Sequence, residues 1–225
     1  MYHSIDDSGS VLSVNPRNFR IQLEWLRSHG WRGLTSAEFV ARQRGVPGSP
    51  AEVFISFDDG YETTLQVAAP LLAEFRFPAT VLVPTDLVGT HPDCFVRDSE
   101  IIRAQCGYVE ISAADIDATI QVASQIRLLS WEQLAEIRGR GIDVECHGAA
   151  HHFMTRLPDP LLRQELQRSR QALQEAESAN VVASNIQHIF AVTEQTGEGT
   201  RSTAQMVREL SRTAEELKQS VSRFK

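Results

Sequence analysis

The segment VFISFDDG, residues 53–60, joins a strand signal to a pair of acidic residues. The run VFISF has the length and composition of a buried β-strand, and Asp58, Asp59 and Gly60 end it. Neighbouring side chains on a strand point to opposite faces, so a turn at Gly60 is needed to bring both carboxylates to one site. Asp-Gly is also common at ordinary turns, so this segment alone leaves a purely structural role open.

Short apolar runs alternate with helical patterns on both sides of this segment, which is typical of βα units. We expect further buried strands at residues 79–83 and 142–146. Helices are predicted at residues 16–30, at 62–75 with a kink at Pro70, from a capping box of Ser130 and Gln133 to Gly139 or Gly141, and from Asp159 through Gln174. The pattern predicts an α/β fold.

A second chemical signal is the segment HGAAH, residues 147–151, directly after the predicted strand 142–146. Two imidazoles and a carboxylate can hold zinc or a related metal and leave one position for water. Histidines at this spacing can also be solvated or lie in a core, and Cys146 could ligate zinc, although its place in the strand favours the core. Catalytic groups of parallel α/β folds gather at the C-terminal ends of strands, where both signals fall.

With their intervening elements TVLVPTDLVG and LLSWEQLAEIRGRGIDVECH, the segments ISFDDGYETT and ECHGAAHHFMTRL resemble the first two motifs of the polysaccharide deacetylase family of carbohydrate esterases. The opening MYHSI resembles the first strand of that family, and the likeness covers residues 1–95 and 128–175. It implies a distorted (β/α) barrel that removes acetyl groups from N-acetylated amino sugars of a polysaccharide. It also implies a divalent metal, with Zn²⁺ preferred. By position, Asp58 would be the catalytic base, and Asp59, His147 and His151 would hold the metal.

The sequence departs from the family in three places. Gly148 stands where the family usually has Ser or Thr, which implies the loss of one hydrogen bond in the loop. Residues 97–127 form an atypical insert. After Glu175 nothing resembles the later motifs, the last of which supplies the general acid, and His188 is the only later histidine. We therefore expect residues 1–175 to form an incomplete barrel with impaired turnover.

The tail, residues 176–225, has a different period. Apolar or threonine positions recur at alternating intervals of four and three residues: Val182, Ile186, Ile189, Thr193, Thr196, Thr200, Thr203, Val207, Leu210, Ala214, Leu217, Val221 and Phe224. This heptad seam predicts a coiled coil. Residues 180–225 also resemble the C-terminal end of a methyl-accepting chemotaxis receptor of the twitching-motility type. The resemblance implies association, as would a plain helical oligomerisation tail.

Composition excludes several classes of function. The net charge of −7 and the pI near 5.5 argue against nucleic-acid binding and against a polybasic membrane anchor. The three cysteines, Cys94, Cys106 and Cys146, are too scattered for a disulfide framework. With no apolar run of membrane-spanning length and no signal peptide in this sequence, we expect a cytoplasmic protein.

Three hypotheses of function follow. The first is a metal-dependent deacetylase acting on an N-acetylated glycan, with a possible homo-oligomer formed through the C-terminal helix. The alternative is a chemoreceptor-derived coiled-coil protein for interaction or signalling, without catalysis. The third is a degenerate module that binds glycan without turnover.

Overall fold

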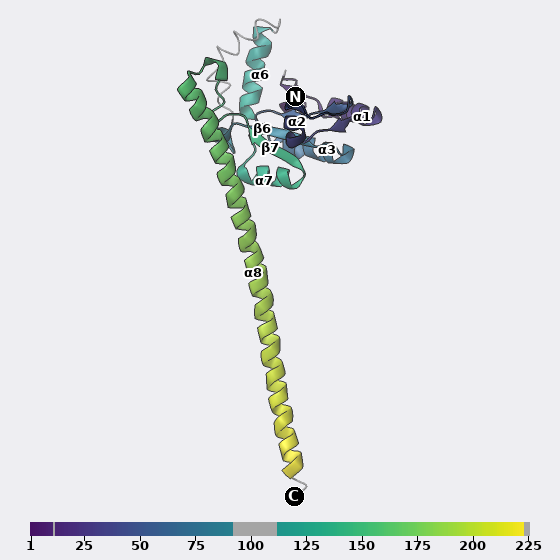
Figure 1. Ribbon diagram of the computed structural model, residues 1–225, viewed down its shortest axis with the longest axis vertical. Coiled ribbons are helices and arrows are strands. Elements are labelled where there is room, and N and C mark those ends of the chain that lie inside the picture. The colour runs from purple at the N-terminus through teal and green to yellow at the C-terminus, as the bar shows by residue number, and fades with distance from the viewer. Residues whose placement is uncertain (11, 92–111, 223–225) are drawn as a thin grey trace. The chain divides into compact units, whose positions relative to one another are not determined.

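The computed structural model describes residues 1–10, 12–91 and 112–222 (Figure 1). The chain divides into two compact units, Met1–Glu177 and Ser178–Lys225. The first unit is a mixed α/β domain that contains all the residues of the predicted site. The second unit is helical.

The first unit alternates strands with helices. Its helices are α1 (Pro16–Ser28), α2 (Ser36–Gln43), α3 (Ala69–Phe75), α6 (Ala113–Gln125), α7 (Trp131–Gly139) and the beginning of α8 (Asp159–Ser222). Its strands are β1 (Ser4–Ile5), β2 (Ser13–Val14), β3 (Arg32–Gly33), β4 (Glu52–Val53), β5 (Ser56–Phe57), β6 (Ala79–Val83) and β7 (Ile142–Cys146). Three short helical turns complete it: η1 (Thr64–Ala68), η2 (Thr85–Leu87) and η3 (Met154–Arg156).

The central sheet has the strand order β5-β6-β7, and all its strands are parallel. Tyr2 forms a parallel bridge beside Phe57, with its N–H donating to the Ser56 carbonyl over 2.8 Å. Figure 1 shows β6 and β7 next to each other in this sheet. Strands β1-β2 and β3-β4 form two separate parallel pairs. The strands in the described part of the chain do not close into a barrel, so the mixed α/β architecture is confirmed and the barrel is not.

The predicted strand 53–57 is wrong as a single element, because its pairing changes partway along. The Val53 carbonyl accepts from the Leu34 N–H at 2.9 Å, whereas the Ile55 carbonyl accepts from the Thr80 N–H at 2.9 Å. The segment therefore belongs to two ladders, as β4 and β5. Its C-terminal end still lies in the central sheet, beside β6.

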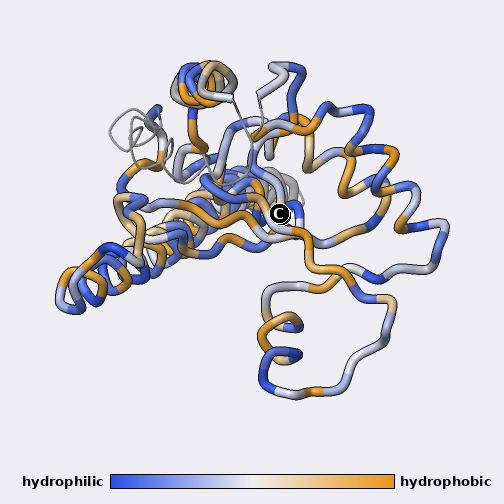
Figure 2. The backbone as a smooth tube through the Cα atoms, turned by 90° about the horizontal axis from the view of Figure 1, so that it is seen from above, coloured by the Kyte–Doolittle hydropathy of each residue, from blue (hydrophilic) through white to orange (hydrophobic). Residues whose placement is uncertain are grey.

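Two helix predictions are confirmed in detail. In α1, Phe19 and Leu23 are fully buried, and Gly30 follows the helix with a φ of +73°. Before α7, the Ser130 hydroxyl accepts from the Gln133 N–H and the Gln133 side chain accepts from the Ser130 N–H. The amphipathic pattern that buries one face of such helices is visible as alternating orange and blue along the tube in Figure 2.

The helix predicted at residues 62–75 is correct in position but consists of two parts. It begins as the π-helical turn η1 and continues as α3, in which Pro70 lies at the start. Pro70 is tolerated there because the first residues of a helix donate no intrahelical hydrogen bond.

The main core lies between the sheet and helices α1, α3 and α7. Phe57 is its centre: it is fully buried, stacks on Tyr2 at 5.5 Å and meets Phe19 edge-on at 5.9 Å. Burial of a side chain of this size contributes about 1.5–3 kcal/mol. A smaller cluster joins α6 to Tyr61 and Leu128.

The second unit is helical from Ser178 to Ser222, as the heptad pattern predicts. Val182, Ile186 and Ile189 are about half exposed. The threonines at the centre of the seam donate their hydroxyl hydrogens to carbonyls one turn earlier in the same helix. The side chains of the seam from Val207 onward, and Phe224 altogether, lie outside the described residues. In the part of the chain that the structure describes, no helix is long and apolar enough to cross a membrane.

Candidate metal centre

The two acidic residues of the predicted site follow β5 directly. Both are buried, Asp58 being 7% exposed and Asp59 2% exposed. Asp59 has a φ of +67° and Gly60 a φ of +72°, so the left-handed turn begins one residue earlier than the sequence suggested. A non-glycine residue in this region costs about 1–3 kcal/mol, which the surrounding structure has to offset.

The two histidines follow β7 in a five-residue segment, residues 147–151, which we call the histidine loop. The His147 N–H donates to the Val83 carbonyl at 2.8 Å and continues the β6–β7 pairing into the loop. Gly148 and His151 then adopt φ values of +79° and +56°. These two left-handed positions turn the chain so that both imidazoles face Asp59.

The topology explains why the two clusters meet. Strands β5 and β7 lie on either side of β6 and run parallel, so their C-terminal ends share one edge of the sheet. The His151 Nε2 atom lies 2.9 Å from Asp59 Oδ1, and the His147 Nε2 atom lies 3.6 Å from the same oxygen. One ligand atom from each of the three residues falls within 4.8 Å of the others.

The arrangement fits a cation. Both carboxylate oxygens of Asp59 are buried, and the imidazoles of His151 and His147 lie nearest to its Oδ1 atom, at 2.9 and 3.6 Å. A buried carboxylate is costly unless a positive charge or a metal compensates it. The donor set of one carboxylate and two imidazoles is one that zinc uses in sites with an open coordination position.

The electrostatics separate the two aspartates. Burial acts to raise the pKa of Asp59, but the hydrogen bond and charge of His151, together with His3 and His147, outweigh it and lower that pKa. Burial raises the pKa of Asp58 above its usual value, with the neighbouring Asp59 adding to the effect. The ionised carboxylate is thus favoured at Asp59, and Asp58 is the stronger proton acceptor.

Burial also lowers the pKa of the His147 imidazole, and the charge of Asp59 works against that shift. A lowered pKa favours the neutral ring, which is the form that binds metals. The structure therefore brings Asp59, His147 and His151 together, with Asp58 beside them.

Other candidate residues lie elsewhere or outside the description. Cys146 packs against the main core and belongs to no cluster of metal-binding groups among the described residues. His152 is exposed beside the loop, and His188 is exposed in the second unit. Cys94 and Cys106 lie outside the described residues, as do residues 97–111 of the insert.

Sequence analysis did not identify two residues that lie at the site. His3 acts electrostatically on Asp58, Asp59 and His147 because the N-terminal segment pairs beside β5. Glu165, on α8, accepts hydrogen bonds from the backbone of the histidine loop. A lone histidine and a glutamate inside a helix carry no spacing signal that would have identified them.

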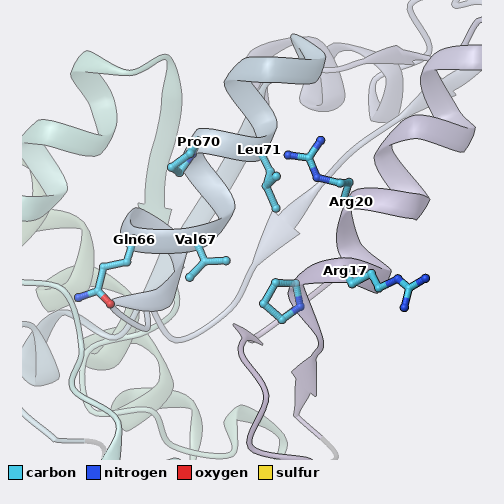
Figure 3. Close-up of a pocket in the computed structure, with 7 residues that line it drawn as sticks. Arg17, Arg20, Gln66, Val67, Pro70 and Leu71 are labelled. Carbon is cyan, nitrogen blue, oxygen red and sulfur yellow. The ribbon is translucent and has the colours of Figure 1, made fainter.

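A surface pocket lies apart from these residues. It has a volume of about 480 Å³ and lies between the start of α1 and the η1–α3 segment (Figure 3). Arg17, Arg20, Gln66, Val67, Pro70 and Leu71 line it together with Pro16. None of the four site residues contributes to it.

The chain resembles known proteins over part of its length. YxkH of Bacillus subtilis (strain 168) is 35% identical over 119 residues, which are 52% of this chain and 41% of that protein. Poly-beta-1,6-N-acetyl-D-glucosamine N-deacetylase of Staphylococcus aureus (strain N315) is 36% identical over 77 residues, 34% of this chain and 27% of the enzyme. The chain thus spans less than half the length of these curated relatives.

Two solved structures share the fold. IcaB from Ammonifex degensii gives a TM-score of 0.56 at 21% identity, covering 79% of this chain and 67% of that one. The deacetylase PplD of Streptococcus pyogenes, in complex with acetate, gives 0.57 at 22% identity, covering 78% and 66%. These matches support the deacetylase part of the sequence analysis and give no support to the chemoreceptor resemblance of the tail. A sequence model of the family described as polysaccharide deacetylase matches residues 45–184, well over half of the chain, and the chain therefore belongs to the polysaccharide deacetylase family.

Proposed function

We propose that the chain is a metal-dependent deacetylase that hydrolyses the N-acetyl groups of amino-sugar residues in a polysaccharide. The observation that carries the proposal is the cluster of Asp59, His147 and His151, with the buried carboxyl group of Asp58 beside it. Family membership and the printed names of the relatives, which include deacetylases of an N-acetylglucosamine polymer, favour this substrate class.

In this proposal Asp59, His147 and His151 hold the metal, and zinc suits that donor set best. A divalent ion there supplies Lewis acidity toward the acetamide carbonyl and toward water. Asp58 takes the proton from the attacking water, a role that its raised pKa favours. The products are acetate and a free amine: the leaving nitrogen takes up a proton from solvent, and Asp58 releases to solvent the proton that it accepted from water.

The test is acetate release from N-acetylglucosamine oligomers by the zinc-loaded protein. Asp58→Asn keeps the shape of the side chain but cannot accept the proton. We expect it to bind zinc like the wild type and to lose about 10²–10⁴-fold in turnover. Asp59→Asn is expected to lose zinc binding and activity together. Acetate release that persists after removal of the metal, or in Asp58→Asn, would contradict the mechanism.

We also propose that residues 1–175 are the deacetylase-like domain and that the tail, residues 176–225, associates with a second copy of the chain. Val182, Ile186 and Ile189 present apolar surface, and four threonines on the same seam have their hydroxyl groups satisfied within the helix. The threonines can therefore be covered by a partner helix without leaving a polar group unsatisfied.

A further inference from the structure

The side chain of Glu165 reaches from α8 to the backbone of the histidine loop. It is 4% exposed, and its Oε1 atom accepts hydrogen bonds from the Ala149 N–H at 3.0 Å and the Ala150 N–H at 2.6 Å. These two amides lie between His147 and His151 in the sequence. One carboxylate oxygen thus holds the peptide groups that connect the two imidazoles.

The loop needs such an anchor because its backbone is strained. Gly148 and His151 both have positive φ values, and His151 carries a side chain that this region disfavours. Conformations of this kind persist only where the surroundings over-determine them. Ala149 is fully buried, so its N–H also requires an acceptor within the protein.

The opposite side of the loop is tied to the end of β6. The Thr85 N–H donates to the Gly148 carbonyl at 3.1 Å, and the Asp86 N–H donates to the Ala149 carbonyl at 2.9 Å. Asp86 also pairs with Arg168 of α8 at 2.5 Å. The loop is therefore held through its carbonyls by the residues after β6 and through its amides by Glu165.

Gly148 is linked to this arrangement. A Cβ atom on Gly148 would lie 3.3 Å from Glu165 Oε1 and 2.8 Å from the Met154 Cε atom. The absence of a side chain at position 148 lets the carboxylate approach the loop closely.

We propose that Glu165 is a positioning residue that fixes the spacing and direction of the two imidazoles for the metal. The inference rests on the proposed function, since it assigns Glu165 a role toward the same metal centre. Hydrogen bonds to an ionised carboxylate are roughly twice as strong as those between neutral groups, which suits the task of holding a strained loop.

The experiment titrates zinc into metal-stripped protein and compares the wild type with three variants. Glu165→Ala removes the acceptor and is expected to weaken zinc binding by about 10–100-fold, the range found for groups that support metal ligands. Glu165→Gln keeps a neutral oxygen acceptor and is expected to fall between Glu165→Ala and the wild type. Gln164→Ala, at an exposed position on the same helix turn, is the matched control and should bind like the wild type.

A second measurement separates positioning from general stability. Amide hydrogen exchange of the metal-free proteins should speed up at Ala149 and Ala150 in Glu165→Ala, with little change in β6 and β7. Wild-type zinc affinity in Glu165→Ala would overturn the proposal, as would Glu165→Gln binding no better than Glu165→Ala. Faster exchange throughout the sheet would overturn it by making the role a structural one.

If the proposed function is wrong, the wild type itself binds no zinc or releases no acetate, which differs from a result in which only the role of Glu165 fails. The exchange comparison still decides whether Glu165 anchors the loop: unchanged exchange at Ala149 and Ala150 would overturn the inference, and faster exchange confined to them would support it.

Discussion

Replacement of Gly148 by alanine tests the geometry of the histidine loop most directly. Gly148 has a φ of +79°, where an L-residue pays about 1–2 kcal/mol. The new Cβ would meet the Met154 Cε atom at 2.8 Å and Glu165 Oε1 at 3.3 Å. The methionine end can move aside, so we expect the backbone to dominate and the free energy of unfolding to fall by about 1–2 kcal/mol.

The assay is thermal unfolding of the metal-stripped protein, followed by zinc titration. For a unit of this size, 1 kcal/mol corresponds to about 2–4 °C in Tm, so the expected loss is about 2–8 °C. Zinc affinity should fall as well, because Gly148 directly follows His147. The control is Gly139→Ala at the end of α7, where the φ is ordinary and nothing lies within 4 Å of the added Cβ. It should leave Tm unchanged or raise it slightly.

Gly148→Ser distinguishes the family resemblance from the backbone argument, because the resemblance leads one to expect Ser or Thr at this position. That resemblance implies that a hydroxyl group would add a stabilising hydrogen bond to the loop. The geometry predicts instead that Gly148→Ser is destabilised relative to the wild type, with any gain over Gly148→Ala limited to one hydrogen bond of about 1 kcal/mol. A Tm and a zinc affinity at or above wild-type values in both variants would refute the argument from backbone strain.

Three further predictions concern stability and association. Phe57→Ala empties a fully buried position in the core and should cost about 3–5 kcal/mol in chemical denaturation; a loss below about 1 kcal/mol would contradict the packing described. Arg168→Ala breaks an exposed pair with Asp86 and should change stability by no more than about 1 kcal/mol, a much smaller effect than that of Phe57→Ala measured in the same way. Sedimentation should give a mass above that of the monomer, and the double variant Ile186→Asn/Ile189→Asn should be monomeric; a wild type that remains monomeric at high concentration would exclude association through the tail.

Sequence analysis located best the strands that can be recognised from their own residues, without knowledge of their partner strands. Residues 79–83 and 142–146 are β6 and β7 with the predicted bounds, because a short, mainly apolar run in β6 and an alternation of apolar and acidic residues in β7 both indicate a strand locally. The break between β4 and β5 could not be predicted, because it depends on a change of partner from β3 to β6. The π-helical turn η1 before α3 likewise could not be predicted from the spacing of apolar residues.

The four predicted site residues meet because the C-terminal ends of parallel strands share an edge, and this could be argued from the sequence. Glu165 could not be found in that way. Apolar periodicity would turn Leu162 and Leu166 inward together, yet Leu166 is 50% exposed while Glu165 and Ser169 are buried. Which face of α8 is buried depends on the groups that pack against it, and these include the amides of the histidine loop. That contact joins segments far apart in the fold, so the sequence of α8 alone does not predict it.

The positions of unusual backbone geometry fall at the site. The non-glycine residues of the described chain with positive φ values are Asp59, Arg76 and His151, and two of these three are proposed metal ligands. Because strained positions persist only where neighbouring contacts fix them, the geometry of the Asp59, His147 and His151 cluster depends on groups outside the cluster. The Val83 carbonyl, which accepts from the His147 N–H, and the Glu165 carboxylate, which accepts from the Ala149 N–H, are two such groups. A chain that keeps Asp59, His147 and His151 but loses the contacts of Val83 and Glu165 would retain the motif and lose the metal centre. The motif alone is therefore a weaker indication of activity than the motif together with these contacts.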